Sequence, residues 1–462
     1  MPRGTSEDHA EAAEPAGSRI VTGVLPRSGL FSRLGPPLLR GVLSTRDSDL
    51  AAAARDFGNR VHLRPVAVLH PADAEDVAAI VRFGRENGFA VVPRGAGCSV
   101  DGQAQASDGI VVDLSSLSAV GEPAPDRVRV DGGARWSAVL DATLPRGRAP
   151  LVVPDHLGLS VGGTLSVGGI GGTSHRYGSV ADNVLELEVV TADGDLLTCS
   201  PVRRPELFDA VRGSLGRYGI ITGATLALTG ARSSARTYRL VHHDPAALLV
   251  DQRRLVHEGR FEHVEGHAHR SGTSGWRFVL EAMQSFDAPH EPDDTALLKG
   301  LTHHHVDTIG TTSYRDFLNR VAPLEARLRA IGSWQHHPHP RCNVLLPGRE
   351  AAALVTEALA GLTEEDIGPG GSVLLYPVPT ARLAAPNVPK ARDALTVVFG
   401  LQRTAPPGRP ELLDRMVRDN LALRAAVRKA GGADYAYAAT HCEAPDAPEP
   451  FGRTAPSRSP RP

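Results

Sequence analysis

A glycine-rich segment, 93–103, has the residue types to hold a phosphate group. It lies between two apolar runs, 89–92 and 109–114, so the sequence predicts a strand, a tight turn and a second strand. Glycines remove Cβ atoms and leave backbone N–H groups free to point at phosphate oxygens. The segment is not the dinucleotide fingerprint whose three glycines open a helix. By itself, such a turn is also what ordinary loop geometry requires.

Two further glycine-rich segments strengthen the phosphate interpretation. Three Gly-Gly pairs fall within residues 162–172, and the glycines of 213–219 precede another apolar run. All three segments lie within a stretch that is about one domain long. Together they predict a long, phosphate-bearing cofactor that lies along exposed backbone.

These segments resemble the FAD-binding domain of the vanillyl-alcohol oxidase superfamily, and within it most closely the cytokinin dehydrogenases. The resemblance rests on R-G-x-G-x-S-x-x-G-Q-A at 94–104 and on D-x-L-x-L-S-V-G-G-T-L-S-x-x-G-I-x-G at 155–172. Shorter matches follow at 183–184, 198–201, 205–208 and 219–222. The likeness extends more thinly over 64–402.

The resemblance implies an α+β fold, in which a two-part PCMH-type FAD-binding domain carries an inserted α+β substrate (cap) domain. It also implies FAD as the cofactor, which would perform the electron transfer while the protein orients it and handles protons. The residues that the resemblance places at the cofactor are Pro93, Arg94, Gly95, Ala96, Gly97, Cys98, Ser99, Gln103, Asp155, Ser160, Gly163, Ser166, Ile170, Ile220 and Tyr435.

Two carboxylates are the candidate catalytic residues. Asp155 stands where the family has its catalytic aspartate, and a carboxylate can accept the N–H proton when an amine is oxidised. Glu281, in the run 277–282, matches a glutamate that the family pairs with that aspartate. Two carboxyl groups that share a proton raise one apparent pKa. The alternatives are a turn cap for Asp155 and a solvent-facing strand position for Glu281.

Cys98 departs from the family, which usually has a histidine there that binds the flavin covalently. Cysteine could form a thioether to the flavin. We expect instead a small residue beside the flavin edge and FAD held non-covalently. A reactive thiol needs an activated thiolate, and the sequence offers no obvious cation other than Arg94.

Two histidine runs, 303–305 and 336–339, raise the question of a metal site. Adjacent side chains on a strand alternate faces, so such histidines cannot easily share one ion, and we expect no metal. The segment 314–321 matches a Y-x-D-F-L-N-R-V stretch of the family. Its apolar residues Phe317 and Leu318, with Val321, have helical spacing and are expected in the core.

The chain divides into four expected parts. These are an N-terminal extension with a disordered start at 1–60, the FAD-binding domain at 61–230, the substrate domain at 231–405, and a C-terminal helix with a disordered tail at 406–462 that is truncated relative to the family. The expected helices include a short one at 50–57, one capped by Asp73, two amphipathic ones at 316–331 and 350–362, and one at 411–430.

Composition excludes several classes of protein. A net charge of −2 over 462 residues gives no basic excess for nucleic acid. The cysteines Cys98, Cys199, Cys342 and Cys442 are far apart, which argues against a zinc site or a disulfide framework. The acidic beginning does not resemble a signal peptide, and no apolar run approaches the ~20 residues of a membrane span. We therefore expect a cytoplasmic protein without a nucleic-acid or membrane partner.

The favoured hypothesis is oxidation of the N6 side-chain amine of a cytokinin-like adenine, with oxygen or a quinone-like molecule as the electron acceptor. Two departures from the family keep alternatives open. Residues 380–383 lack its tryptophan, and the chain after Tyr435 lacks its closing helix and glutamine. One alternative is an FAD-dependent oxidase of an alcohol or ring C–H in bacterial secondary metabolism. The other is an inactive flavin-domain remnant.

Overall fold

The structure is a computed structural model that describes residues 29, 31, 34–270 and 275–435. The chain divides into two compact units, 1–35 and 36–462, and the account below concerns the second unit. The expectations of a disordered start and tail, and Cys442, lie outside the described residues.

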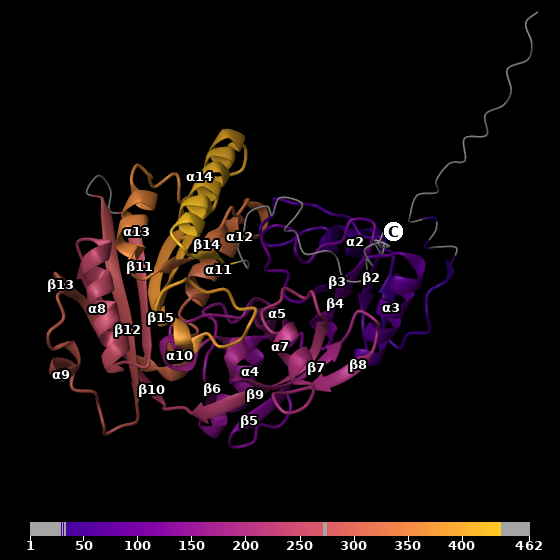
Figure 1. Cartoon of the computed structure of the whole chain (residues 1–462), viewed down its shortest axis with the longest axis horizontal. Helices are drawn as coiled ribbons and strands as arrows, with labels where there is room; N and C mark the ends of the chain where they lie inside the picture. The colour runs from indigo at the N-terminus through magenta and orange to yellow at the C-terminus, as the bar shows by residue number, and fades with distance from the viewer. Residues whose placement is uncertain (1–28, 30, 32–33, 271–274, 436–462) are drawn as a thin grey trace, which may run out of the picture. The chain divides into compact units, whose positions relative to one another are not determined.

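Two small sheets are built from the first half of the unit (Figure 1). The four-stranded sheet has the order β1-β2-β4-β3, with β2, β4 and β3 parallel and β1 antiparallel. Its strands are β1 (Val42–Ser44), β2 (Ala67–His70), β3 (Val91–Arg94) and β4 (Ile110–Asp113). The antiparallel sheet β5-β9-β7-β8, with β6 paired to β9, comprises β5 (Arg127–Asp131), β6 (Arg148–Pro150), β7 (Val184–Val190), β8 (Leu196–Cys199) and β9 (Ile220–Gly230).

The helices of this half include α2 (Asp47–Ala53), α3 (Ala74–Asn87), α4 (Trp136–Thr143), α5 (Val161–Val167), α6 (Ser174–Tyr177) and α7 (Pro205–Val211). The cap predicted for α3 is confirmed, because the Asp73 side chain accepts a hydrogen bond from the backbone N–H of Asp76. The helix expected at 50–57 is α2, which begins at Asp47 and ends at Ala53. Asp56 lies beyond it and accepts a bond from the N–H of Gly102, at 2.7 Å.

The second half forms an eight-stranded antiparallel sheet with the order β13-β10-β12-β11-β15-β16-β14-β17. The strands are β10 (Ser234–His242), β11 (His263–Arg270), β12 (Trp276–Phe286), β13 (His305–Ser313), β14 (Cys342–Pro347), β15 (Ser372–Pro379), β16 (Leu395–Gln402) and β17 (Ala433–Asp434). The helices are α8 (Pro245–Glu258), α9 (Asp294–Leu298), α10 (Tyr314–Leu318), α11 (Ala322–Ala330), α12 (Ser333–His336), α13 (Ala351–Leu359) and α14 (Pro410–Lys429).

One face of this large sheet is apolar and packs against α8 (Figure 1). Leu280 and Ala282 of β12 belong to the same core cluster as Leu248 of α8. Side chains alternate along a strand, so Glu281, which lies between them, points to the opposite face. That opposite face carries the polar site described below.

The helix expected at 316–331 is interrupted. The chain forms α10 and then α11, with residues 319–321 between them. Pro323 stands in the first turn of α11, where its missing N–H costs least, and proline disfavours helical backbone in the residue before it. The core positions expected in α10 are confirmed, since Phe317 is 3% and Leu318 8% exposed. Val321 is half-buried. The other expected helices are present as α13 and α14.

Candidate active site

The first glycine-rich segment is the loop that joins β3 to β4. Gly97 has φ +67°, a conformation that favours glycine, and a Cβ on Gly95 would overlap Ser160 Oγ. Arg94 at the end of β3 places its guanidinium against Gly97. Its Nη1 atom is buried and has no hydrogen-bond partner within the described part of the chain, and burial lowers the pKa of Arg94. A tight backbone and a guanidinium with one buried, unpartnered nitrogen fit the pyrophosphate of FAD.

The other two glycine-rich segments meet this loop. Ser160 precedes α5, and a Cβ on Gly163 would approach its Oγ to 2.8 Å. In the third segment the backbone N–H of Leu215 donates to the Ser166 carbonyl, at 2.8 Å. Gly216 in turn lies beside Pro93. The three segments that the sequence singled out therefore lie together in space.

The remaining predicted cofactor residues have ordinary structural contacts. Ser99 Oγ donates to Asp56, at 3.0 Å, and the exposed Gln103 accepts a bond from the backbone of Asp101. The Ile170 carbonyl accepts a bond from Tyr376 Oη. Ile220 begins β9 and is buried, and the buried Tyr435 donates its N–H to the Asn343 carbonyl. Ala96 has its carbonyl 3.8 Å from Cys98 Sγ.

Cys98 has more cationic neighbours than the sequence indicated. Burial raises the pKa of its thiol, while Arg135 and Arg341, as well as Arg94, act to lower it. Burial is the larger effect, so the thiol stays neutral at ordinary pH.

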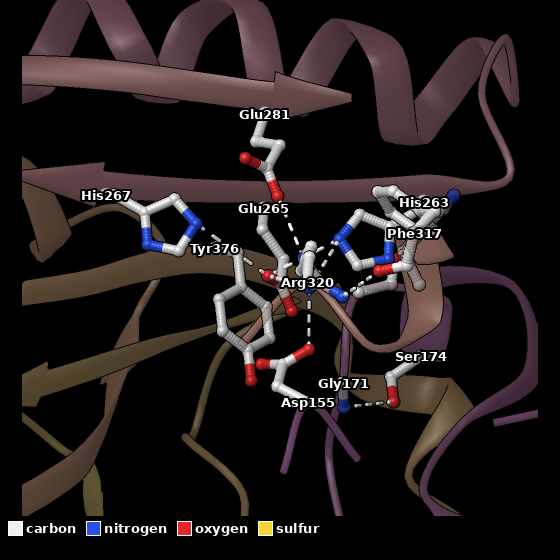
Figure 2. A network of polar contacts seen from close by, with 12 residues as sticks. Asp155, Gly171, Ser174, His263, Glu265, His267, Glu281, Phe317, Arg320 and Tyr376 are labelled. Carbon is white, nitrogen blue, oxygen red and sulfur yellow. Dashed lines mark hydrogen bonds and ion pairs between the residues drawn. The ribbon is translucent and has the colours of Figure 1, made fainter. Parts of the chain in front are cut away.

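Asp155 lies in the segment between β6 and α5 and contacts Arg320, a half-buried arginine within the expected helix 316–331. Arg320 Nη2 donates to Asp155 Oδ1 at 2.7 Å and to Glu265 Oε2 at 2.9 Å. Arg320 Nε donates to Glu281 Oε1 at 3.0 Å. Figure 2 shows the guanidinium at the centre of these carboxylates. The structure thus brings together both predicted catalytic residues through Arg320.

The elements around this cluster explain its geometry. Glu265 on β11 and Glu281 on β12 are directly opposite each other in the sheet register. Arg320 projects from the break between α10 and α11, and its guanidinium lies 4.7 Å from the centre of the Phe317 ring. The edge-on ring of His263 packs against the same phenylalanine, at 5.0 Å.

The pKa values of the three carboxylates in this cluster are shifted in different directions. Burial and the charge of Glu265 raise the pKa of Asp155, and Arg320 only partly offsets them. Burial also acts to raise the pKa of Glu265, but the neighbouring His263 and Arg320 outweigh it and lower that pKa. The pKa of Glu281 is lowered in the same way, chiefly by Arg320 against burial. Asp155 is therefore the strongest proton acceptor of the three.

His263, Glu265 and Glu281 each place one ligand atom within 4.8 Å of the others, a geometry that could receive a cation. The guanidinium of Arg320 already lies among these atoms, with Nη2 3.3 Å from His263 Nε2. We therefore assign these groups to Arg320 and not to a metal. Neither of the two histidine runs contributes to a cluster of this kind in the described ranges.

Sequence reasoning missed Arg320, Glu265, His263 and His267. A signal for the β11 residues was present, because His263, Glu265, His267 and His269 alternate with apolar or small residues and so share one face of a strand. Arg320 lies inside the 314–321 match, but no local pattern signals its contacts with the three carboxylates.

Comparison with known proteins assigns the class. Residues 65–200 match the family model "FAD binding domain", and residues 278–453 match "Cytokinin dehydrogenase 1, FAD and cytokinin binding". The fold is that of 6-hydroxy-D-nicotine oxidase from Arthrobacter nicotinovorans, with a TM-score of 0.65 at 24% identity over 84% of this chain and 86% of that one. The protein is an FAD-dependent oxidoreductase with a PCMH-type FAD-binding domain and a cytokinin-binding domain.

Full-length relatives define the family. The chain is 38% identical to the uncharacterized oxidoreductase ORF5 in the fasciation locus of Rhodococcoides fascians, over 86% of this chain and 90% of the relative. It is 34% identical to cytokinin dehydrogenase 9 and 37% identical to cytokinin dehydrogenase 4 of Oryza sativa, over 76% and 73% of those proteins and 79% and 76% of this chain. The chain belongs to the cytokinin dehydrogenase family. No helix of the described residues is long and apolar enough to cross a membrane.

Proposed function

We propose that this protein oxidises the N6 side-chain amine of a cytokinin-like adenine, with Asp155 as the residue that accepts the amine proton. The observation that carries the proposal is the position of Asp155, a carboxylate of raised pKa at the junction of the FAD-binding segments and the polar face of the large sheet. A carboxylate whose pKa is raised is a better general base than one at its ordinary value. Bound FAD would supply the acceptor for the hydride.

The other charged residues orient this base. Arg320 fixes one oxygen of Asp155 by a charge-assisted hydrogen bond, and leaves the second oxygen free of that contact. Glu281 holds the guanidinium from the sheet side, so it acts on Asp155 through Arg320 and not by direct contact. In this assignment Glu281 is a positioning residue, a different role from direct sharing of a proton.

We further propose that FAD lies along the three glycine-rich segments of an FAD-binding domain at 61–230, below a substrate domain at 231–405. The neutral Cys98 thiol supports non-covalent binding. Oxygen or a quinone-like molecule would reoxidise the flavin.

A second candidate substrate is an alcohol or a ring C–H group. A carboxylate that accepts an N–H proton can equally accept an O–H proton. Leu383, in the segment where the family has a tryptophan, is buried in the hydrophobic core, and this departure from the family favours a different substrate.

The visible spectrum of the purified protein under anaerobic conditions tests both candidates. We expect a yellow protein whose flavin band bleaches when N6-isopentenyladenine is added. A band that persists with this amine but bleaches with an alcohol would favour the second candidate. A colourless protein that gains no flavin on incubation with FAD would favour an inactive remnant.

Asp155→Asn tests the assigned base. We expect the bleaching rate to fall by about 100-fold or more while the FAD content stays unchanged, because the amide cannot accept the proton. Asp193→Asn is the matched control, since its side chain is 71% exposed on the surface. An unchanged rate in Asp155→Asn would reject the assignment.

A further inference from the structure

A short segment between α2 and β2 runs alongside the glycine-rich loop that joins β3 to β4. The backbone N–H of Phe57 donates to the Gly97 carbonyl at 2.8 Å. The N–H of Gly58 donates to the Ser99 carbonyl at 3.0 Å. A Cβ on Gly58 would lie 1.9 Å from the Val100 carbonyl oxygen, so this close approach requires glycine. The segment and the loop are therefore in direct backbone contact.

Asp56, in the same segment, binds the loop through its side chain. Its Oδ2 atom accepts a hydrogen bond from the Gly102 N–H at 2.7 Å and another from the Ser99 hydroxyl at 3.0 Å. Asp56 is only 8% exposed. A buried carboxylate needs such partners, because a polar group without them is costly to bury. Since both of these donors belong to the loop, the conformation of the loop and the burial of Asp56 depend on each other.

The other side of the segment is attached to the second half of the chain. The Gly58 carbonyl accepts a hydrogen bond from the His339 N–H at 2.8 Å. Asn59 Nδ2 donates to the His336 carbonyl at 2.7 Å. The Phe57 ring stacks on that of His339, with centroids 4.1 Å apart. The segment therefore lies between the glycine-rich loop and the connection from α12 to β14.

The part of the loop that this segment contacts is also the part beside the candidate pyrophosphate contact. Gly97, whose carbonyl accepts the Phe57 N–H, lies against the Arg94 guanidinium. A loop that adopts its binding conformation for only part of the time weakens the apparent affinity for a ligand by that fraction. Hydrogen bonds that hold the loop in this conformation should therefore strengthen FAD binding.

We propose that Asp56 is a positioning residue for FAD. Its carboxylate holds the loop between β3 and β4 in the conformation that receives the pyrophosphate. Asp56 acts through the Ser99 hydroxyl and the Gly102 N–H, and not by contact with the cofactor. Residues 56–59 attach the loop to the connection from α12 to β14. This inference rests on the proposed placement of FAD along the glycine-rich segments.

The charge of Asp56 has an effect that must be separated from its hydrogen bonds. Burial lowers the pKa of Arg94, and the charges of Asp113 and Asp56 act to raise it. A change at Asp56 therefore alters the surroundings of Arg94 as well as the loop. Asp56→Asn distinguishes the two effects, because it removes the charge but keeps an oxygen that can accept both hydrogen bonds.

Titration of the FAD-free full chain with FAD, followed by flavin fluorescence, measures the Kd of the cofactor. In Asp56→Ala we expect the Kd to rise by about 10-fold or more, because the loop loses two hydrogen bonds to a carboxylate. In Asp56→Asn we expect a change of about threefold at most. Asp244→Ala is the matched control. That carboxylate also accepts a backbone N–H, from Ala247 at 2.8 Å, but it caps α8, and its loss should leave the Kd unchanged.

Hydrogen exchange of the FAD-free chain distinguishes a disordered loop from a general loss of stability. In Asp56→Ala the Gly102 amide should exchange about 10-fold faster or more relative to the Ile110 amide, which donates to the Ala90 carbonyl. A general loss of stability would accelerate both amides. Asp56→Ser, whose short hydroxyl reaches the loop less well, gives the same comparison if Asp56→Ala does not fold.

An unchanged Kd in Asp56→Ala would overturn the proposal. Equal losses of affinity in Asp56→Ala and Asp56→Asn would also overturn it, because they would assign the effect to charge and not to the hydrogen bonds. A wild-type chain that binds no FAD would count against the proposed function instead. An unchanged relative exchange of Gly102 would reject the role of Asp56 in ordering the loop, whether or not FAD binds.

Discussion

At the residue scale, one guanidinium contacts three carboxylates, of which Glu265 and Glu281 are buried and Asp155 is half-buried. The guanidinium does not lower the pKa of all three below its ordinary value. Glu281 Oε2 also accepts a hydrogen bond from Arg239 Nη1, at 2.6 Å. Glu265 lies beside His263 and His267. Arg320 is the cation that contacts Asp155 directly in the described structure. The carboxylate with the fewest cationic partners is the one whose pKa rises. This difference in pKa makes Asp155 the group that accepts a proton, while Glu265 and Glu281 stay negatively charged.

Removal of the shared cation should move the pH dependence of the reaction. Because Arg320 lowers the pKa of Asp155, Arg320→Met should raise it further and shift the acidic limb of the kcat/KM profile to higher pH. The same change leaves buried negative charges unpaired, and should lower the free energy of unfolding by about 3 kcal/mol. The two measurements are the pH profile and urea unfolding.

Arg320→Lys separates charge from geometry. It keeps a positive charge but loses the fork that contacts three carboxylates, so its acidic limb should fall between those of wild type and Arg320→Met. An acidic limb at the wild-type pH in Arg320→Met would mean that Arg320 does not set the pKa of Asp155.

Sequence could name Asp155 and Glu281 because each lies in a short stretch with a recognisable pattern. Arg320 could not be named in the same way. Its partners Asp155 and Glu281 are 165 and 39 residues away in the chain, and no local pattern encodes such contacts. The helical spacing of 314–321 correctly placed Phe317 in the core. The same spacing gave no reason to expect that Arg320 contacts distant carboxylates.

At the element scale, the loop between β3 and β4 carries another carboxyl group whose side chain is buried, that of Asp101. Asp101 pairs with Arg60 at 2.6 Å, with side chains that are 6% and 10% exposed. Burial nevertheless raises the pKa of Asp101 to about 6. The folded protein then binds this proton more tightly than the unfolded chain, whose carboxyl group has a pKa near 3.8. The associated stability is present below pH 4 and is lost as the pH rises through 6.

Asp101→Asn should remove this pH dependence from the loop. Relative to wild type, the variant should gain free energy of unfolding between pH 4.5 and pH 7.5, by at most about 3 kcal/mol. Urea unfolding of the FAD-free protein at the two pH values measures the difference. Asp126→Asn is the control, because that side chain is 65% exposed. A constant difference between variant and wild type would show that Asp101 does not titrate in this range.

The elements themselves were predictable where a local signal exists. The cap at Asp73 and the strands around the glycine-rich loop follow from residue types within a few positions. The division of 316–331 into α10 and α11 was missed because the apolar spacing continues across the break. Pro323 was the available signal, and it places the interruption where Arg320 can leave the helix and reach the sheet.

At the scale of the whole molecule, FAD should bind reversibly and should stabilise the folded protein. Because burial keeps Cys98 neutral, acid precipitation should leave the flavin in the supernatant. Removal of FAD should lower the thermal midpoint, since a ligand at 100 times its Kd contributes about 2.7 kcal/mol to the folded state. Calorimetry of the FAD-free and reloaded protein measures this contribution. Flavin that stays with the precipitate in wild type but not in Cys98→Ser would instead establish a thioether.

The contact between Arg320 and Asp155 has a consequence for the order of events in folding. The contact joins the segment between β6 and α5 to the break between α10 and α11, and the two residues are 165 positions apart in the chain. Closing so long a loop is slow and costs entropy, so local elements form earlier. The proton-accepting site should therefore be among the last features to assemble. A chain that has gained the colour of FAD but not yet its activity would mark that late stage of maturation.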